Sequence, residues 1–245
     1  MKELRECQLE LLKLLQAFDR ACKKCGMQYW LDSGTLLGAL RHQGFIPWDD
    51  DLDLCILKSE FKKHKQELEE ALEEPYELVE AGSTERLYPR IVNKNCRIKR
   101  KDSLSGKIRE DCLWIDLFLV REVSPKLKRI ADPLYGRCKR RLCGAVNDGA
   151  LRKTAALLLY PAALLLKAAV CLHGQIFCRG LYSHDFGVPF YSLRLKKDIF
   201  PLGSCIFEGS SFPAPKDSDA YLSLIYGNWR QLPPPEKRQN HDILL

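Results

Sequence analysis

The chain has 245 residues, 46% of them hydrophobic, and a formal net charge of +7. This length allows one large domain or two small ones, and the apolar fraction is ample for a buried core. Eleven cysteines occur without an export signal at the N-terminus, which argues against a secreted disulfide framework. We therefore expect free thiols and a cytoplasmic location.

The first 25 residues have the spacing of an amphipathic helix. Its apolar stripe consists of Leu4, Leu11, Leu15, Phe18 and Cys22. Cys22 and Cys25 have CxxC spacing, but the sequence has no second CxxC or pair of histidines to complete a zinc site. We interpret both cysteines as ordinary helix positions.

The segment 29–56 contains the strongest chemical signal. Four acids, Asp49, Asp50, Asp51 and Asp53, run into the apolar strand pattern LDLCIL. Residues two apart in a strand point to the same side, so Asp51 and Asp53 share one face. Such a pair suits a hard divalent cation, Mg²⁺ or Mn²⁺. We expect Asp49 to shape this site and Asp50 to face away from it.

The alternative interpretation of this acidic run is a solvated surface turn without a metal, since DxD spacing is common by chance. The placement favours the metal. Like charges held beside an apolar strand repel each other unless a cation neutralises them.

Residues 59–74 have the pattern of a charged surface helix, with Ser59 as its N-cap and Pro75 as its stop. Lys94 and Asn95 predict a tight turn between two strands. The strand-like segments around them are residues 76–80, 87–93 and 96–100.

Residues 112–120, CLWIDLFLV, form an apolar run of strand length that a single charge, Asp116, interrupts. A carboxylate within a buried strand is costly unless it is paired, ligates a metal or is neutralised. We interpret Asp116 as the third member of the acidic cluster, brought beside Asp51 and Asp53 by sheet pairing. The alternative is an ion pair with a nearby arginine such as Arg90.

Residues 125–190 have a different character, because they are basic, helical in pattern and strongly apolar over 155–172. Between residues 121 and 180 there are twelve Lys and Arg but three Asp and Glu. The apolar stretch is about as long as a short transmembrane span, but Pro161 and Lys167 interrupt it.

We expect this region to form a pair of helices packed on the sheet. The alternative is a helix in the membrane interface, with residues 125–180 in peripheral contact with anionic headgroups on the inner face of a membrane. The segment lacks the interleaved aromatic residues of a single-strand binding site, so we do not expect nucleic acid as a partner.

The C-terminal part returns to strands and turns, followed by a short helix. Asp217 is placed to cap this helix, and Gly227 to end it. The prolines at 233–235 predict an extended surface segment.

Three carboxylates around one or two divalent cations suit phosphoryl transfer. A turn at Gly34 and Thr35 offers backbone and hydroxyl donors to phosphates, because glycine allows close approach. Arg41, His42 and Arg90 are candidate phosphate clamps, since arginine bonds two oxygens at once.

Four segments together closely resemble the LicD family, which includes bacterial phosphocholine transferases and the eukaryotic fukutin and fukutin-related proteins. The segments are GTLLGALRHQGFIPWDDDLDL, WIDLF, FEGSSFPAPKDSDAYLSLIYGNW and LPPPEKRQNH. The resemblance covers about residues 25–121 and 198–242, and the GT…RHxGFIPWDDDxD segment is highly specific. The insertion at 125–190 carries no matching motif.

The resemblance implies a nucleotidyltransferase-like α/β (α+β) fold, a mixed sheet flanked by helices, here as a single domain over 1–245 with a helical insertion. By motif, the turn residues are Gly34 and Thr35, the metal pair is Asp51 and Asp53, and the third carboxylate is Asp116. It also implies the reaction: a phospho-alcohol passes from a CDP-activated donor to a hydroxyl of a glycan or lipid-linked glycan, and CMP is released.

Departures from the family pattern are small. Gln43 stands where many relatives have Lys, and Pro235 where an acid is common. His241 falls on the family's terminal histidine, for which a loop-fixing and a catalytic role remain open. Two other functions remain as alternatives: true nucleotidyl transfer from an NTP, and a non-enzymatic module that binds membranes or polyanions.

Overall fold

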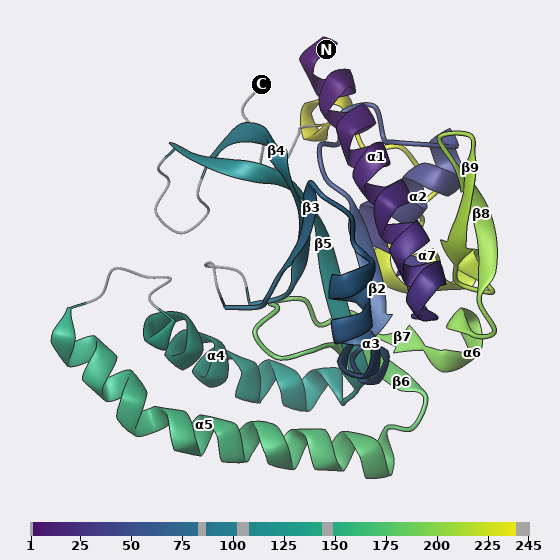
Figure 1. Ribbon diagram of the computed structural model, residues 1–245. Helices are drawn as coiled ribbons and strands as arrows, with labels where there is room; N and C mark the ends of the chain where they lie inside the picture. Colours follow the sequence, from purple (N-terminus) through teal and green to yellow (C-terminus); the bar gives the residue numbers. More distant parts are fainter. Residues whose placement is uncertain (1, 83–86, 102–107, 144–148, 239–245) are drawn as a thin grey trace.

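A seven-stranded mixed sheet forms the centre of the molecule in the computed structural model, which describes residues 2–82, 87–101, 108–143 and 149–238 (Figure 1). The main strand order is β1 (Trp30–Leu31), β2 (Asp53–Leu57), β5 (Ile108–Glu122), β4 (Arg90–Lys101) and β3 (Tyr76–Val79). Two short strands, β6 (Leu181–His184) and β7 (Arg194–Leu195), extend the sheet from the end of β5. This mixed sheet with flanking helices confirms the predicted fold class.

One face of the sheet carries the main hydrophobic core. It packs against α1 (Lys2–Cys25) and α3 (Lys58–Ala71), because the apolar stripe of α1 meets the inward residues of β5. Leu11, Leu15 and Phe18 of α1 and Ile115 and Leu117 of β5 are each fully buried. The alternation along β5 sends Asp116 to the opposite face of the sheet.

The remaining small elements lie along one side of the molecule in Figure 1. They are α2 (Ser33–His42), α6 (Lys196–Ile199), the hairpin β8 (Gly203–Phe207) and β9 (Ser210–Ala214), α7 (Ser218–Tyr226) and the short 3₁₀ helix η1 (Pro235–Lys237).

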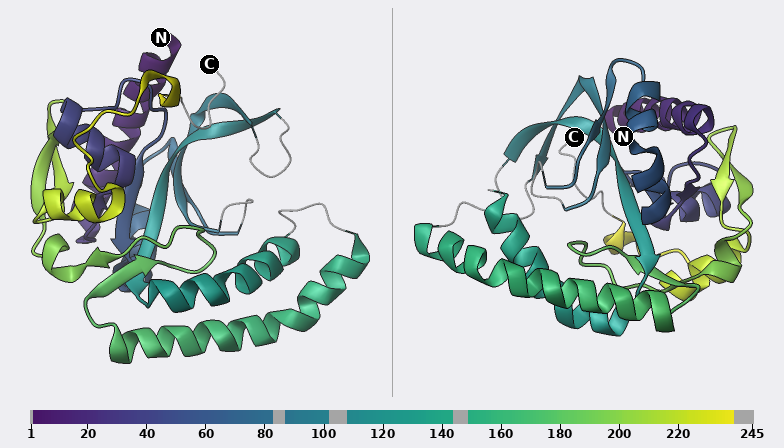
Figure 2. Two further views of the ribbon diagram at one scale, coloured as in Figure 1. Left: turned by 180° about the vertical axis from the view of Figure 1, so that it is seen from behind. Right: turned by 60° about the horizontal axis from the view of Figure 1, so that its bottom comes forward.

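Two long helices, α4 (Pro125–Leu142) and α5 (Ala150–Phe177), form an antiparallel pair at the edge of the molecule (Figures 1 and 2). The Ser124 side chain caps α4. A second, smaller core joins the two helices to the end of β5, and its buried members are Val123, Ala131, Tyr135, Ala163, Val170, Cys171 and Phe186. The pair of helices predicted for this region is therefore present.

Several further predictions are confirmed. The helix α1 has nearly the predicted bounds, and β5 extends the predicted strand at 112–120 in both directions. Asp217 caps α7 by accepting a 3.0 Å hydrogen bond from the Ala220 amide, and Gly227 ends that helix with a φ of 68°. All eleven cysteines are free thiols.

The turn predicted at Lys94 and Asn95 is wrong. These residues lie within β4, which is one strand and shifts its register against β5 between Asn93 and Arg97. The Asn93 side chain accepts a 3.0 Å hydrogen bond from the Asn95 amide inside this irregular segment. A β-bulge thus takes up the polar residues that suggested a turn.

The predicted start of α3 is also wrong. Its N-cap is Leu57, the last residue of β2, and no side chain caps the helix, so Ser59 lies within the first turn. The strand runs directly into the helix and leaves no room for a capping turn. The helix ends at Ala71, four residues before Pro75.

Two corrections concern the motif-bearing segments. Gly34 and Thr35 do not form an isolated turn but belong to the first turn of α2. The strand β2 begins at Asp53, so Asp51 precedes it.

Near the C-terminus, Pro234 is extended, but Pro235 already starts η1. His241 lies outside the described residues.

Candidate active site

Four carboxylates line one cavity of about 860 Å³ at the start of β2 and the middle of β5. They belong to Asp49, Asp51, Asp53 and Asp116. The other lining residues are Ser33, Gly34, Tyr88, Phe118, Arg129, His184, Pro189, Phe190, Tyr191, Ser192, Leu224, Ile225 and Tyr226.

Sheet pairing brings two of these acids together. The strands β2 and β5 are parallel, and Asp53 is directly opposite Asp116 in their register. Opposite residues of neighbouring strands project from the same face, so both carboxylates reach the cavity. The Asp116 amide donates a 3.0 Å hydrogen bond to the carbonyl of Leu52, which fixes this register at the first residue of β2.

The first turn of α2 is fastened to the same point. The Thr35 hydroxyl accepts a 2.8 Å hydrogen bond from the backbone amide of Asp53. Thr35 is buried and does not line the cavity. Its hydroxyl therefore supports the start of β2, and the phosphate contact predicted for it would use the proton of the same hydroxyl.

The N-terminus of α2 faces the cavity through Ser33 and Gly34. A Cβ added to Gly34 would lie 3.0 Å from Oδ2 of Asp49, so glycine lets the helix approach the carboxylate closely. Ser33, the first residue of the helix, has a φ of 44°, which is in the left-handed region that few non-glycine residues adopt. The unpaired amides and the dipole of a helix N-terminus favour negative charge at this wall.

A side chain from α1 holds the acidic loop in place. Gln8 donates hydrogen bonds to the carbonyls of Asp49 (2.8 Å) and Ile46 (3.3 Å). Asp49 lines the cavity, and the shaping role expected of it stays a prediction. Asp50 is buried and does not line the cavity, so it faces away from the site as predicted.

The crowding of negative charge is visible in the pKa of Asp51. Burial raises this pKa well above its usual range, and repulsion from Asp53, Asp49 and Asp116 raises it further. Tyr88 donates a 3.3 Å hydrogen bond to Oδ2 of Asp116. The site therefore favours a cation or a proton among its carboxylates.

The helical insertion supplies residues that the sequence did not reveal. Arg129 of α4 is the one lysine or arginine among the described residues that line the cavity. It lies over the ring of Tyr191, with its guanidinium carbon 5.2 Å from the ring centroid. Burial and the charge of Arg194 lower the pKa of His184 well below its usual range, so this histidine is neutral.

The neighbouring wall, residues 189–192, depends on a buried lysine. The Lys128 ammonium donates hydrogen bonds to the carbonyls of Val188 (2.8 Å) and Phe190 (2.9 Å). Burial lowers the pKa of Lys128 to about 8. A single helical turn of α4 thus positions both this wall and Arg129.

The three predicted phosphate clamps lie outside the acidic cavity. Arg41 lines an adjacent cavity of about 420 Å³, which shares Gly34 and Asp49 with the acidic one. It donates hydrogen bonds to the ring of His42 (3.0 Å) and to the carbonyl of Trp229 (3.2 Å).

Arg90 is directly opposite Asp116 in the pairing of β4 with β5, but it does not line the cavity. Its side chain is 2% exposed, and the ion pair it makes at 3.6 Å is with Asp111. The guanidinium carbon is 5.1 Å from the centroid of the Trp114 ring. The phosphate-binding role of Arg90 therefore stays a prediction, because its side chain is buried and does not line the cavity.

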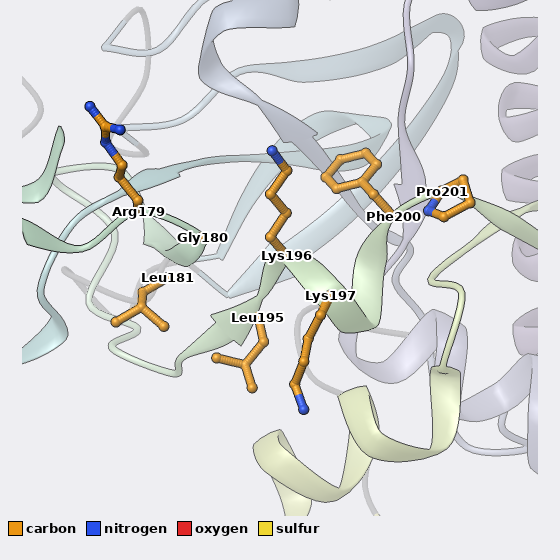
Figure 3. A pocket seen from close by; sticks show the side chains of 8 residues that line it. All are labelled: Arg179, Gly180, Leu181, Leu195, Lys196, Lys197, Phe200 and Pro201. Atoms are coloured by element: carbon orange, nitrogen blue, oxygen red, sulfur yellow. The ribbon is translucent and has the colours of Figure 1, made fainter.

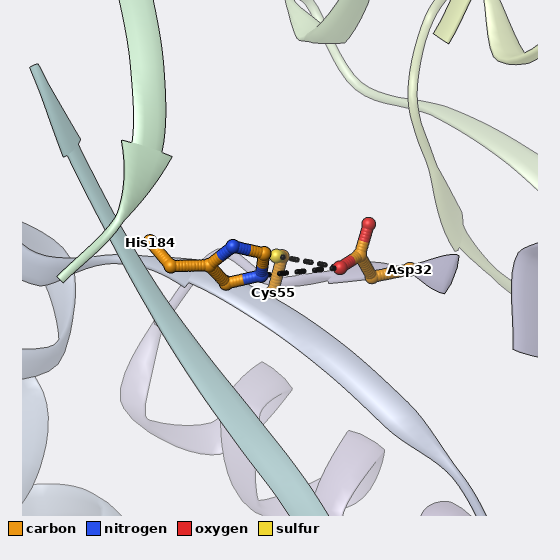
Figure 4. A group of neighbouring side chains, drawn as sticks. All are labelled: Asp32, Cys55 and His184. Carbon is orange, nitrogen blue, oxygen red and sulfur yellow. Dashed lines mark hydrogen bonds and ion pairs between the residues drawn. The ribbon is translucent and has the colours of Figure 1, made fainter. Parts of the chain in front are cut away.

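A second group of ligand-type side chains lies next to the cavity and shares His184 with its lining. Asp32, Cys55 and His184 offer atoms within 4.8 Å of one another, and all three are buried (Figure 4). Asp32 is already neutralised, because it receives hydrogen bonds from Arg194 (2.6 Å) and Tyr221 (2.5 Å).

Although burial opposes its ionisation, the charge of Arg194 and the hydrogen bonds from Tyr221 and Arg194 hold the pKa of Asp32 below its ordinary value. Burial and the nearby carboxylate raise the pKa of the Cys55 thiol well above its usual range. A charged acid with its own arginine and a protonated thiol make a poor metal site. This group instead holds β1, β2, β6 and β7 together from within.

A further cavity of about 730 Å³ lies at the far end of α5 (Figure 3). Its basic side chains do not converge, since Lys196 and Lys197 point away from each other. The remaining lining residues are Arg179, Gly180, Leu181, Leu195, Phe200 and Pro201. The cavity therefore lacks the focused charge of the acidic site.

Comparison with known proteins finds a family match for the part of the chain that contains the cavity acids. Residues 26–119, which include all four cavity acids, match the family described as LicD/FKTN/FKRP, nucleotidyltransferase domain. The lipopolysaccharide cholinephosphotransferase LicD of Haemophilus influenzae is 29% identical over 98% of this chain and 96% of its own length.

Shorter matches link the chain to eukaryotic transferases. The human ribitol 5-phosphate transferase FKRP is 43% identical over 23% of this chain and 10% of its own length. The mouse ribitol-5-phosphate transferase FKTN is 42% identical over 20% of this chain and 11% of its own length. Residues 26–119 therefore match the nucleotidyltransferase domain of the LicD/FKTN/FKRP family, and nearly the whole chain is similar to a bacterial LicD protein.

Proposed function

We propose that this protein transfers a phospho-alcohol, such as phosphocholine, from a CDP-activated donor to a hydroxyl of a glycan and releases CMP. The observation that carries this proposal is the convergence of Asp49, Asp51, Asp53 and Asp116 on one cavity beside the N-terminus of α2. Relatives named as cholinephosphotransferase and ribitol 5-phosphate transferase support the class of group that is moved.

The carboxylates fit a divalent cation, Mg²⁺ or Mn²⁺. Oxygen ligands are those that these ions prefer, and burial together with repulsion from neighbouring carboxylates raises the pKa of Asp51. We propose Asp51, Asp53 and Asp116 as the ligands. A bound ion would neutralise negative charge on the donor and on the departing CMP.

Other residues of the cavity would bind the donor phosphates and limit the access of water. The α2 amides at Ser33 and Gly34 are placed to receive donor phosphate oxygens. Arg129, on α4, is placed to bind the same phosphates because its planar fork can bond two oxygens. Tyr88, Phe118 and Phe190 enclose the site and limit the access of water.

In the reaction, the acceptor hydroxyl oxygen forms a bond to the phosphorus that carries the alcohol. The bond from that phosphorus to the bridging oxygen of the donor breaks, and CMP leaves with the electron pair. The hydroxyl proton passes to a carboxylate of the site, for which we propose Asp116.

All eleven cysteines are free thiols, which fits a cytoplasmic location.

Release of CMP tests this proposal. The full chain is incubated with CDP-choline or CDP-ribitol, Mg²⁺ and a lipopolysaccharide or lipid-linked glycan acceptor. We expect CMP to appear in step with phospho-alcohol on the acceptor. A parallel incubation with labelled NTPs addresses the alternative, because attachment of a nucleotide with release of pyrophosphate would overturn phospho-alcohol transfer in favour of nucleotidyl transfer.

A further inference from the structure

The helix α5 contacts the protein body through one narrow stripe. Ala156, Ala163 and Val170, spaced seven residues apart, are buried along it. Gly174 completes the stripe, because a Cβ there would lie 2.4 Å from the carbonyl oxygen of Glu122 at the end of β5. The small side chains let α5 lie tightly against α4 and β5.

The opposite face of α5 is apolar and uncovered. Its exposed large side chains are Leu151, Leu157, Leu158, Leu159, Leu164, Leu165, Leu166, Leu172, Ile176 and Phe177. Leu158 and Leu165, one heptad apart, are 75% and 73% exposed. Such a large exposed apolar surface marks a contact with a partner or a membrane. We call it the outer face of α5.

Charged residues lie near the two ends of α5 and not on its outer face. Residues 154–177 contain no acid, and their one lysine, Lys167, points inward with its ammonium 3.9 Å from the centroid of the Tyr135 ring. Basic residues surround the two ends of the helix. They are Lys139, Arg140, Arg141, Arg152 and Lys153 at one end and Arg179, Lys196 and Lys197 around the cavity of Figure 3 at the other.

We propose that the outer face of α5 docks on the surface of an anionic lipid bilayer, with the helix lying in the plane of the interface. Apolar side chains would enter the boundary between headgroups and acyl chains, while the basic ends contact anionic headgroups. This proposal rests on the surface itself and does not depend on the proposed reaction.

The helix is also long and apolar enough to cross a membrane by length and composition, and it is the one such helix in the described part of the chain. Its packing favours the flat orientation. Spanning would require α5 to leave α4, and Lys167 would lose its contact with Tyr135 inside the hydrocarbon region.

A second copy of the chain fits this surface less well than anionic lipid does. Two outer faces packed together would bring their basic ends into proximity, and like charges repel. Anionic headgroups complement the same residues. Arg129, on α4 beside α5, also lines the acidic cavity, so the helix pair that would dock contributes a residue to that cavity.

Vesicle flotation tests the proposal with the full chain. Vesicles of phosphatidylglycerol and phosphatidylcholine in equal parts are compared with vesicles of phosphatidylcholine alone, for the wild type and for the pair Leu158→Glu and Leu165→Glu. We expect flotation with the anionic vesicles, and a fall in membrane affinity of about tenfold or more in the paired variant. Ile206→Glu, on β8, is the matched control and should float like the wild type.

Three further results decide the outcome. The paired variant should keep the wild-type circular dichroism and thermal midpoint, because both positions are exposed; if it does not, Leu158→Ser with Leu165→Ser takes its place. Alkaline carbonate should release the bound protein, and resistance to it would indicate spanning and overturn the proposal. Absence of flotation, flotation that the variants leave unchanged, or a wild-type dimer that the paired variant dissociates would also overturn it.

Discussion

Asp32 and Asp51 are acidic residues beside the same strand, yet their surroundings are opposite. Asp32 has Arg194 at 2.6 Å and a hydrogen bond from Tyr221, and these partners lower its pKa despite burial. Asp51 lies among further carboxylates, and its pKa is raised. A buried acid paired with an arginine holds the fold together, whereas a cluster of acids whose mutual repulsion raises a pKa is suited to bind a cation from solution.

The largest effect should come from Asp32→Asn. This change leaves Arg194 buried without its counter-ion, and we expect a loss of about 3–5 kcal/mol in the free energy of unfolding. Urea denaturation followed by circular dichroism measures it. Asp219→Asn, on the surface of α7, provides the control and should cost much less. A loss within the control range would mean that the Asp32 cluster is not structural.

Asp53→Asn should affect activity rather than stability, in contrast to Asp32→Asn. We expect it to lower the rate of CMP release by on the order of 10²–10³-fold, because one proposed cation ligand is lost. The free energy of unfolding should stay constant or rise, since repulsion within the cluster decreases. Steady-state kinetics and urea denaturation on the same preparation give both values. Near-wild-type activity would exclude Asp53 from the metal site.

Stabilisation by Mg²⁺ should depend on pH. The folded-state pKa of Asp51 is raised, so the folded protein binds more protons than the unfolded chain in the window above the ordinary aspartate pKa. Without metal, stability from this group decreases as pH rises through the window. Mg²⁺ competes with the proton, so its stabilising effect should grow with pH, reaching about 3 kcal/mol at a hundredfold excess over Kd.

Thermal midpoints measured with and without Mg²⁺ across this window check the linkage. Asp51→Asn should remove the pH dependence, and Cys55→Ser, in the neighbouring cluster, should keep it. An equal shift at every pH would contradict the coupling between the cation and the carboxylates.

The smallest effect should come from Arg129→Met, which preserves the length of the side chain but removes its charge. We expect the KM for the CDP donor to rise by about tenfold with a smaller change in kcat, because the guanidinium contacts donor phosphate in our proposal. Arg137→Met, on an exposed part of the same helix, is the matched control. Equal kinetics for the two variants would remove Arg129 from the donor site.

Local patterns predicted the acidic cluster well. Alternation along LDLCIL and the single charge in CLWIDLFLV indicated that Asp53 and Asp116 would meet, and they are direct partners in the sheet. The period of two along each strand shows which face a side chain takes, and even short sequences display it. Asp51 reaches the same cavity, although it precedes the strand.

The basic residues could not be predicted in the same way. Arg41, His42 and Arg90 were chosen because their side chains can bind phosphate, but none of them is among the residues that line the acidic cavity. Arg129 comes from the insertion, which carries no motif, and only the packing of α4 places it at the cavity. The polar residues near Asn95 fill a bulge, because pairing of β4 with β5 outweighs the local preference for a turn.

The most direct test of the difference between the two clusters is Mn²⁺ binding, followed by electron paramagnetic resonance. We predict saturable binding by the wild type and by Cys55→Ser, and loss of that binding in Asp51→Asn and Asp116→Asn. Absence of Mn²⁺ binding by the folded wild type, or binding that the Asp51 and Asp116 variants leave unchanged, would contradict the assignment of the cation to the acidic cavity.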